Sequence, residues 1–192
     1  DVLGSRGLGD VYKRQIYCSR FVESTDHCFA NHDRIAELNL YDGKADRYFS
    51  GSPVPLAEEL RTWSLGETEA ISSVTYPRER PYYVELSPEK TLPYELETIE
   101  IDTCYNKIFT QEMVAGHWKM ASQSLNSVIL SQSMAIKIFG NAESAIGKHM
   151  TLMRRLNTSP ESTPKTGGIV YTIQAVMKDI PLNNSLDFMQ NI

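Results

Sequence analysis

The four histidines are the first residues to test for chemistry, because a neutral imidazole can act as a general base or bind a metal. His27, His32, His117 and His149 have none of the spacings of known zinc motifs such as HExxH. His27 and His32 lie five residues apart in a polar segment, which is typical of solvated side chains. His117 precedes Trp118, where a partly buried structural histidine is more usual than a site residue. We therefore expect no metal site at these histidines.

Neither the serines nor the carboxylates form a catalytic pattern. No GxSxG nucleophile elbow is present, and no serine is framed by a plausible base. Four carboxylates, Glu95, Glu97, Glu100 and Asp102, lie along one predicted strand. Paired carboxylates can perform acid–base catalysis, but on an alternating strand they are more simply its solvated face. The sequence thus predicts a protein that is not an enzyme and that needs no cofactor.

The three cysteines, Cys18, Cys28 and Cys104, are sparse and odd in number. No two of them have CxxC spacing, so they predict neither a disulfide framework nor a zinc site. A Cys18–Cys28 disulfide would need an oxidising compartment, and buried free thiols are the more common outcome for such residues.

Residues 1–15 resemble a translated sequencing adaptor rather than native protein, and we leave them out of the fold. The native part would then begin at Ile16, with sequence missing before it and also after Ile192. Residues 1–15 hold three of the 19 basic and two of the 24 acidic side chains, which leaves 16 against 22 and a net charge of −6. That balance argues against nucleic acid as a partner, which would need a basic surface. No apolar run of 18 residues is present, so we predict no membrane span within this sequence.

The elements that must position any site are organised around residues 127–150. Val128–Leu130 predicts a short buried strand. Ser131 or Ser133 can cap the helix that follows, whose apolar face is formed by Met134, Ala135, Ile138 and Phe139. Gly140 is expected to end the helix, and Gly147 to close a turn before a strand that begins at His149.

The remaining segments predict many strands and one more substantial helix. Strands are expected over Asp33–Tyr41, with Asp46–Ser50 pairing back on it, and over Ala70–Tyr76, Tyr82–Leu86, Tyr94–Thr103 and Ile169–Lys178. A helix should begin at Ser52-Pro53 and present Leu56, Leu60 and Trp63 on one face. Tyr105–Phe109 predicts one helical turn, and Met113–Trp118 a short strand or a bend at Gly116. Many strands without regular βαβ alternation favour an α+β fold class.

Several motifs occur in the same order as in a known family of membrane proteins. Tyr105–Phe109 followed by Met113–Trp118 resembles an aromatic pair before a short strand and a Gly-Arg-Trp-like bend, with His117 where a basic residue is usual. The strand and helix from Val128 to Gly140 resemble "vvLSe…A..lFG". Further matches are Ala145–Lys148 with "piGk", Tyr171–Pro181 with "ytVvGVvkDvP", continued by Asn184–Phe188, and Asn31–Ile35 with the "aDRIyr" strand. In the motif of Tyr171–Pro181, Ala175 stands in place of the usual glycine.

Together these motifs resemble those of MacB/FtsX-like ABC transporter permeases, in particular the permeases of Bacteroidetes-type bacteria. The resemblance implies that residues 16–192 are a fragment of the periplasmic core domain. It implies a porter-like β-α-β part over 33–75 and an inserted β-rich lobe over 82–179, incomplete at both ends. It further implies a cell inner membrane protein whose fragment lies on the periplasmic side. That protein would relay motion driven by a cytoplasmic ATPase subunit or domain, work as a homodimer, and dock a periplasmic adaptor or substrate.

Contacts with a partner are expected on polar connecting segments, because such segments often carry recognition. We name Arg78, Arg80 and Lys165 as candidate contact residues, in the loop around residues 78–80 and in the hairpin tip of residues 157–168. The main alternative to a permease is a stand-alone secreted α+β binding module. A hydrolase is a third alternative, which requires His117 or His149 to lie within hydrogen-bond reach of Ser, Asp or Glu in a cleft.

Overall fold

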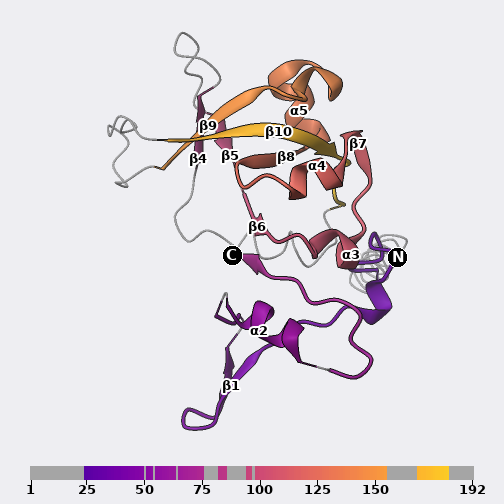
Figure 1. Ribbon diagram of the computed structural model, residues 1–192, viewed down its shortest axis with the longest axis vertical. Coiled ribbons are helices and arrows are strands. Elements are labelled where there is room, and N and C mark those ends of the chain that lie inside the picture. Colours follow the sequence, from indigo (N-terminus) through magenta and orange to yellow (C-terminus); the bar gives the residue numbers. More distant parts are fainter. Residues whose placement is uncertain are drawn as a thin grey trace, which may run out of the picture. The chain divides into compact units, whose positions relative to one another are not determined.

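The computed structural model describes residues 24–181, apart from residues 50, 54, 64, 76–81, 86–93, 97 and 155–167. The described residues divide into two units, with residues 24–33 and 180–181 in one and those of the range 34–179 in the other. Helices and strands alternate irregularly along the chain, and the strands form small sheets (Figure 1). This arrangement confirms the predicted α+β fold class.

A six-stranded sheet dominates the larger unit and is centred on its longest strand, β10. Its strands are β4 (Tyr82–Glu85), β5 (Tyr94–Leu96), β7 (Met113–Gly116), β8 (Ser127–Ser131), β9 (His149–Arg154) and β10 (Ile169–Met177). β10 pairs antiparallel with β9 and β7, and parallel with β8. β8 and β10 share this sheet, since Ile173 lies opposite Val128 and Val176 lies opposite Leu130.

Helix α5 (Gln132–Phe139) begins and ends where the sequence predicts. The Ser131 hydroxyl accepts the amide of Met134 at 3.4 Å, as an N-cap residue does. The Asp179 carboxylate accepts the amide and the hydroxyl of Ser133, each at 3.0 Å, and its negative charge suits the positive end of the helix. Gly140 follows the helix with φ +87°, a conformation that a side chain would strain.

The hydrophobic core lies between α5, the 3₁₀ turn η2 (Glu143–Ala145) and the central strands. Its fully or nearly fully buried members are Leu130, Ala135, Ala142, Ala145, Met150, Ile173 and Val176. Simple alternation along β10 predicts one buried face that excludes Val176, yet Val176 has no exposed surface. The reason is that the pairing register of β10 shifts after Ile173 and again after Val176, so strict alternation does not hold there.

Two short helices flank β7. The predicted turn α3 (Tyr105–Phe109) is confirmed, whereas α4 (Trp118–Ser122) was not predicted. The ring of Tyr105, which is almost completely buried, lies 4.6 Å from the Phe109 ring and 5.9 Å from the Trp118 ring, measured between centroids. Because α4 contacts β8 and β10, this aromatic cluster joins α3 to the sheet.

The segment before the six-stranded sheet differs from its predicted strand. The predicted Asp33–Tyr41 strand is wrong over most of its length, since the chain forms the 3₁₀ turn η1 (His32–Arg34) and is irregular up to β1 (Leu40–Asp42). Among the described residues of this segment, β1 pairs with β2 (Arg47–Phe49), so the predicted return of Asp46–Ser50 onto the strand is confirmed for residues 47–49. The hydrogen-bonded ladder ends at Leu40 opposite Phe49, and a strand without a partner is not stabilised.

Helix α2 (Leu56–Thr62) starts later than Ser52-Pro53, with Pro55 at its N-cap. Leu56 and Leu60 are half-buried, but Trp63, predicted on the same face, is 55% exposed. The cause is that α2 ends at Thr62 and Trp63 is already extended, with ψ 144°, so that it leaves the helical repeat.

The single strand predicted over Tyr94–Thr103 is also wrong. The chain divides there into β5 in the six-stranded sheet and β6 (Glu100–Ile101), which pairs with β3 (Val74–Thr75) in a separate two-stranded sheet. An alternating pattern predicts an extended chain, but it does not specify which strand will be the partner.

Cys28 is exposed and Cys104 is half-buried, so the expected burial of the thiols is not found at these two positions, and Cys18 lies outside the described residues. Across the part of the chain that the structure describes, each helix is too short or too polar to cross a membrane.

Candidate functional site

The residues predicted to contact a partner cannot be placed. Arg78, Arg80 and Lys165 lie outside the described residues, as do the rest of the loop around residues 78–80 and all of the hairpin tip except Gly168. Their role therefore remains a prediction.

The histidines do not form the arrangement that the hydrolase alternative requires. His117 and His149 are both exposed, and His149 Nδ1 lies 3.1 Å from the hydroxyl of Thr172 rather than from Ser, Asp or Glu in a cleft. The rings of His27 and His32 lie with their centroids 4.3 Å apart and are tilted by 45° to each other. No group of three potential metal ligands is present among the described residues.

Asp102, which sequence reasoning assigned only to a solvated strand face, accepts hydrogen bonds from four other described residues of the larger unit. Asp102 follows β6 and precedes α3. Its Oδ1 accepts the hydroxyl of Ser72 at 2.8 Å and the amide of Cys104 at 2.9 Å. Its Oδ2 accepts the amide of Ser73 at 2.8 Å and a hydrogen bond from Arg61 Nη2. We call Asp102 and these four donors the Asp102 cluster.

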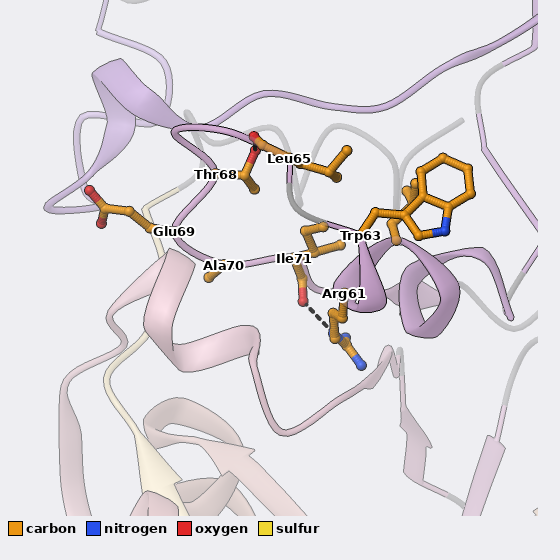
Figure 2. A pocket seen from close by; sticks show the side chains of 8 residues that line it. Arg61, Trp63, Leu65, Thr68, Glu69, Ala70 and Ile71 are labelled. Carbon is orange, nitrogen blue, oxygen red and sulfur yellow. Dashed lines mark hydrogen bonds between the residues drawn. The ribbon is translucent and has the colours of Figure 1, made fainter.

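Arg61 extends this cluster to helix α2. Its Nε donates to the carbonyl of Ile71 at 2.9 Å, while its Nη2 forms the ion pair with Asp102 (Figure 2 draws the first bond). The two side chains of the ion pair are only 29% and 24% exposed, against 55% and 75% for the pair between Arg34 and Glu69. The more exposed pair should contribute little, since water competes with it, whereas the Arg61–Asp102 pair is held by fixed backbone groups.

Two opposing effects act on the carboxyl of Asp102. Partial burial raises its pKa, but the hydrogen bonds from Ser73, Ser72, Cys104 and Arg61 outweigh burial, and the pKa is lowered below the ordinary value for aspartate. The charged form is therefore favoured in the folded protein, and the folded state gains stability from Asp102 only while the carboxyl is ionised.

A pH-dependent loss of stability is expected for the variant Asp102→Asn. At pH 7 the variant should unfold at lower urea concentration than the native chain, because the amide cannot replace the charge. Since the folded pKa is lowered, the native advantage is complete above about pH 4 and decreases as the pH falls through the folded pKa. Urea unfolding between pH 7 and pH 3 measures the difference. Glu69→Gln, in the exposed pair, should show little change, and a loss for Asp102→Asn that is equal at pH 7 and pH 3 would contradict the assignment.

A small pocket lies beside the Asp102 cluster, at the end of α2 and the loop that follows. It measures about 120 Å³ and is lined by Leu60, Arg61, Trp63, Leu65, Thr68, Glu69, Ala70 and Ile71 (Figure 2). Pockets for small molecules usually have volumes of about 300–1,000 Å³. The polar groups of this pocket also already have partners, since Glu69 binds Arg34 and the Thr68 hydroxyl binds the carbonyl of Leu65. The pocket thus offers room for a single side chain rather than for a substrate.

A second pocket lies on the β1–β2 hairpin and is widely open to solvent. It has a volume of about 560 Å³ and is lined by Leu40, Tyr41, Asp42, Gly43, Lys44 and Phe49. We call it the hairpin hollow. The rings of Tyr41 and Tyr48 lie 5.1 Å apart, and the Arg47 guanidinium lies 4.5 Å from the centre of the Phe49 ring. Exposed aromatic groups of this kind occur where proteins contact other macromolecules. The Asp42 carboxylate of the hairpin hollow accepts the backbone amides of Lys44 and Ala45, as it does in a turn.

Two proteins are among the solved structures to which this chain is similar. A domain of a protein named as a permease, from Porphyromonas gingivalis, is 22% identical, with a TM-score of 0.49, over 68% of this chain and 52% of that chain. The periplasmic region of MacB from Actinobacillus actinomycetemcomitans is 18% identical, with a TM-score of 0.46, over 75% of this chain and 59% of that chain. The chain resembles permease domains. No family model matches the sequence, and no curated protein matches it.

The chain thus spans little more than half the length of the two proteins that it resembles. The described residues contribute buried packing, capped turns and one polar cluster, an arrangement suited to holding elements together.

Proposed function

We propose that this chain is an extracytoplasmic piece of an ABC transporter permease, with no chemistry of its own. In this proposal residues 16–192 are the native part, with a porter-like part over residues 33–75 and an inserted lobe over residues 82–179. The full protein relays motion driven by a cytoplasmic ATPase to the periplasmic side. It works there as a homodimer and docks an adaptor or a substrate.

The observation that carries the proposal is that the motifs between Tyr105 and Asp179, taken in their order, lie in one packing unit around β10. Several of their residues have a mechanical role there. Gly116 lets β7 approach β10, Ser131 caps α5, and Gly140 and Gly147 adopt positive φ at turns. Asp179, which belongs to the motif of Tyr171–Pro181, accepts the amide and the hydroxyl of Ser133 at the start of α5. Such residues specify a rigid shape rather than a reaction.

The side of the membrane on which this chain lies provides the first test. Leu125 is completely exposed, so the variant Leu125→Cys in the intact gene product should add a reactive thiol to the surface. In spheroplasts, a maleimide that cannot cross membranes should label this variant above the level of the unmodified protein. If the additional labelling appears only after lysis, the chain lies in the cytoplasm and the proposal fails.

The intact gene provides the second test, because it distinguishes a permease from a secreted binding module. The permease proposal predicts an apolar helix of about 20 residues encoded immediately before Ile16. A cleavable signal peptide before Ile16 and a stop codon soon after Ile192 would instead identify the secreted module. A start codon next to Ile16, with neither an apolar helix nor a signal peptide encoded before it, would exclude both proposals.

A further inference from the structure

The segment that contains α2 is attached to the rest of its unit with little buried apolar surface. None of the described residues between Arg34 and Thr75 is buried. Its last strand, β3, pairs with β6 over two residues only, Val74 opposite Ile101 and Thr75 opposite Glu100. Burial therefore stabilises this attachment weakly, and the hydrogen bonds of the Asp102 cluster provide a correspondingly larger share of it.

The Asp102 cluster contacts the α2 segment on one side. On the other side it is connected to the six-stranded sheet through α3 and α4. On the first side, Arg61 connects α2 to the carboxylate, and Ser72 and Ser73 connect the strand that follows it. On the second side, the amide of Cys104 binds Asp102 Oδ1, and the next residue is the buried Tyr105 of α3. The ring of Tyr105 packs on Trp118 of α4, and α4 contacts β8 and β10. These contacts form one uninterrupted path from α2 to the core.

We infer that Asp102 is the joint through which α2 is coupled to the β10 sheet. While the carboxylate keeps its four donors, the α2 segment and the sheet move as one piece. When the carboxylate is lost, the α2 segment opens by itself and the sheet stays closed. The inference rests on the proposed function only in giving this joint a role in relaying motion, since the coupling itself is a property of the chain.

The coupling is polar and depends mainly on one residue, so it can be lost without unfolding the core. A coupling through a packed apolar interface could be broken only by unfolding part of the core, because buried side chains are close-packed. A coupling through one carboxylate can be lost while the core residues keep all of their contacts. Spatial continuity alone does not demonstrate coupling, so the test must measure how Arg61 and Asp102 act together.

Hydrogen exchange of the whole chain, measured peptide by peptide, tests the joint with the variant Asp102→Asn. We expect exchange in peptides that cover α2 to become at least about fivefold faster, while peptides that cover β8 and β10 change by less than about twofold. The matched control is Asp179→Asn, which removes another carboxylate that accepts an amide and a hydroxyl, but at α5. The control should speed exchange in α5 and leave α2 unchanged.

Three outcomes would contradict the inference. If α2 exchanges at its native rate in Asp102→Asn, the carboxylate does not hold it. If hydrogen exchange in α2 and β10 becomes faster together, Asp102 supports the whole fold rather than a joint.

Arg61→Gln and the double variant complete a double-mutant cycle. Hydrogen exchange of α2 in the double variant should be less than twofold faster than in Asp102→Asn. Independent, multiplying effects would mean that Arg61 and Asp102 do not act through a shared contact. No membrane or ATPase enters this measurement, so its failure would leave the labelling result at Leu125 unaffected.

Discussion

Replacing Gly116 by alanine is expected to destabilise the protein by about 3–5 kcal/mol, among the largest effects of any single substitution here. Gly116 ends β7 with φ +71°, where a side chain is strained. A Cβ atom at this position would overlap with the carbonyl oxygen of Gln174 and lie 2.9 Å from the Cα of Ala175. Both neighbours are backbone atoms of the central strand β10, so neither can move aside without disturbing the sheet.

Gly140 provides the matched control for this prediction. It also has a positive φ, +87°, but a Cβ there would meet no atom within 4 Å. Gly140→Ala should therefore carry only the conformational strain, about 1–2 kcal/mol. Urea unfolding followed by tryptophan fluorescence measures both variants. Equal losses would mean that β7 does not approach β10 as closely as the structure indicates, and a Gly116→Ala chain that fails to fold beside a folded Gly140→Ala chain would support the prediction.

The unit from β8 to β9 was predictable because its signals are local. A serine cap, an apolar face of two helical turns and a glycine stop all lie within a few residues of one another, and each one alone specifies the same geometry. The strand β10 was found from the alternation of its own residues. The helix α4 was not, because the pattern over residues 113–118 predicts a strand or a bend, whereas the strand ends at Gly116 and the helix begins at Trp118.

The elements that failed depend on partners that are distant in the sequence. The predicted strand Tyr94–Thr103 alternates correctly, but its two halves pair with different sheets. The residues before β1 alternate as well, yet no strand lies opposite them. Alternation reports that a segment can be extended, whereas the partner strand decides whether it is.

The Asp102 cluster shows the same division within a single residue. The bond from the Cys104 amide to Asp102 is a local turn signal, an aspartate two residues before the amide it accepts, and it could have been recognised just before the predicted helical turn. The partners Arg61 and Ser72 lie 41 and 30 residues away in the sequence, and no spacing rule connects them. A carboxylate on an alternating strand is usually solvated, so this pattern favoured the wrong environment.

The second large effect is expected at Ile173, in the middle of β10. Its side chain is completely buried in the core that β10 shares with α5 and η2. The variant Ile173→Ala removes buried methyl and methylene groups and leaves a cavity that packed neighbours cannot fill completely. We expect a loss of about 2–5 kcal/mol in the free energy of unfolding.

The same strand offers a control with the same change of side chain. Ile169, the first residue of β10, is 55% exposed, so Ile169→Ala should cost less than about 1 kcal/mol, mostly from the lower strand propensity of alanine. The two variants lose identical atoms from one strand, and their difference in urea unfolding therefore isolates burial. Similar losses would show that β10 is not the centre of the core. A large loss at Ile173 alone would support a rigid sheet, which the proposed coupling through Asp102 requires at its far end.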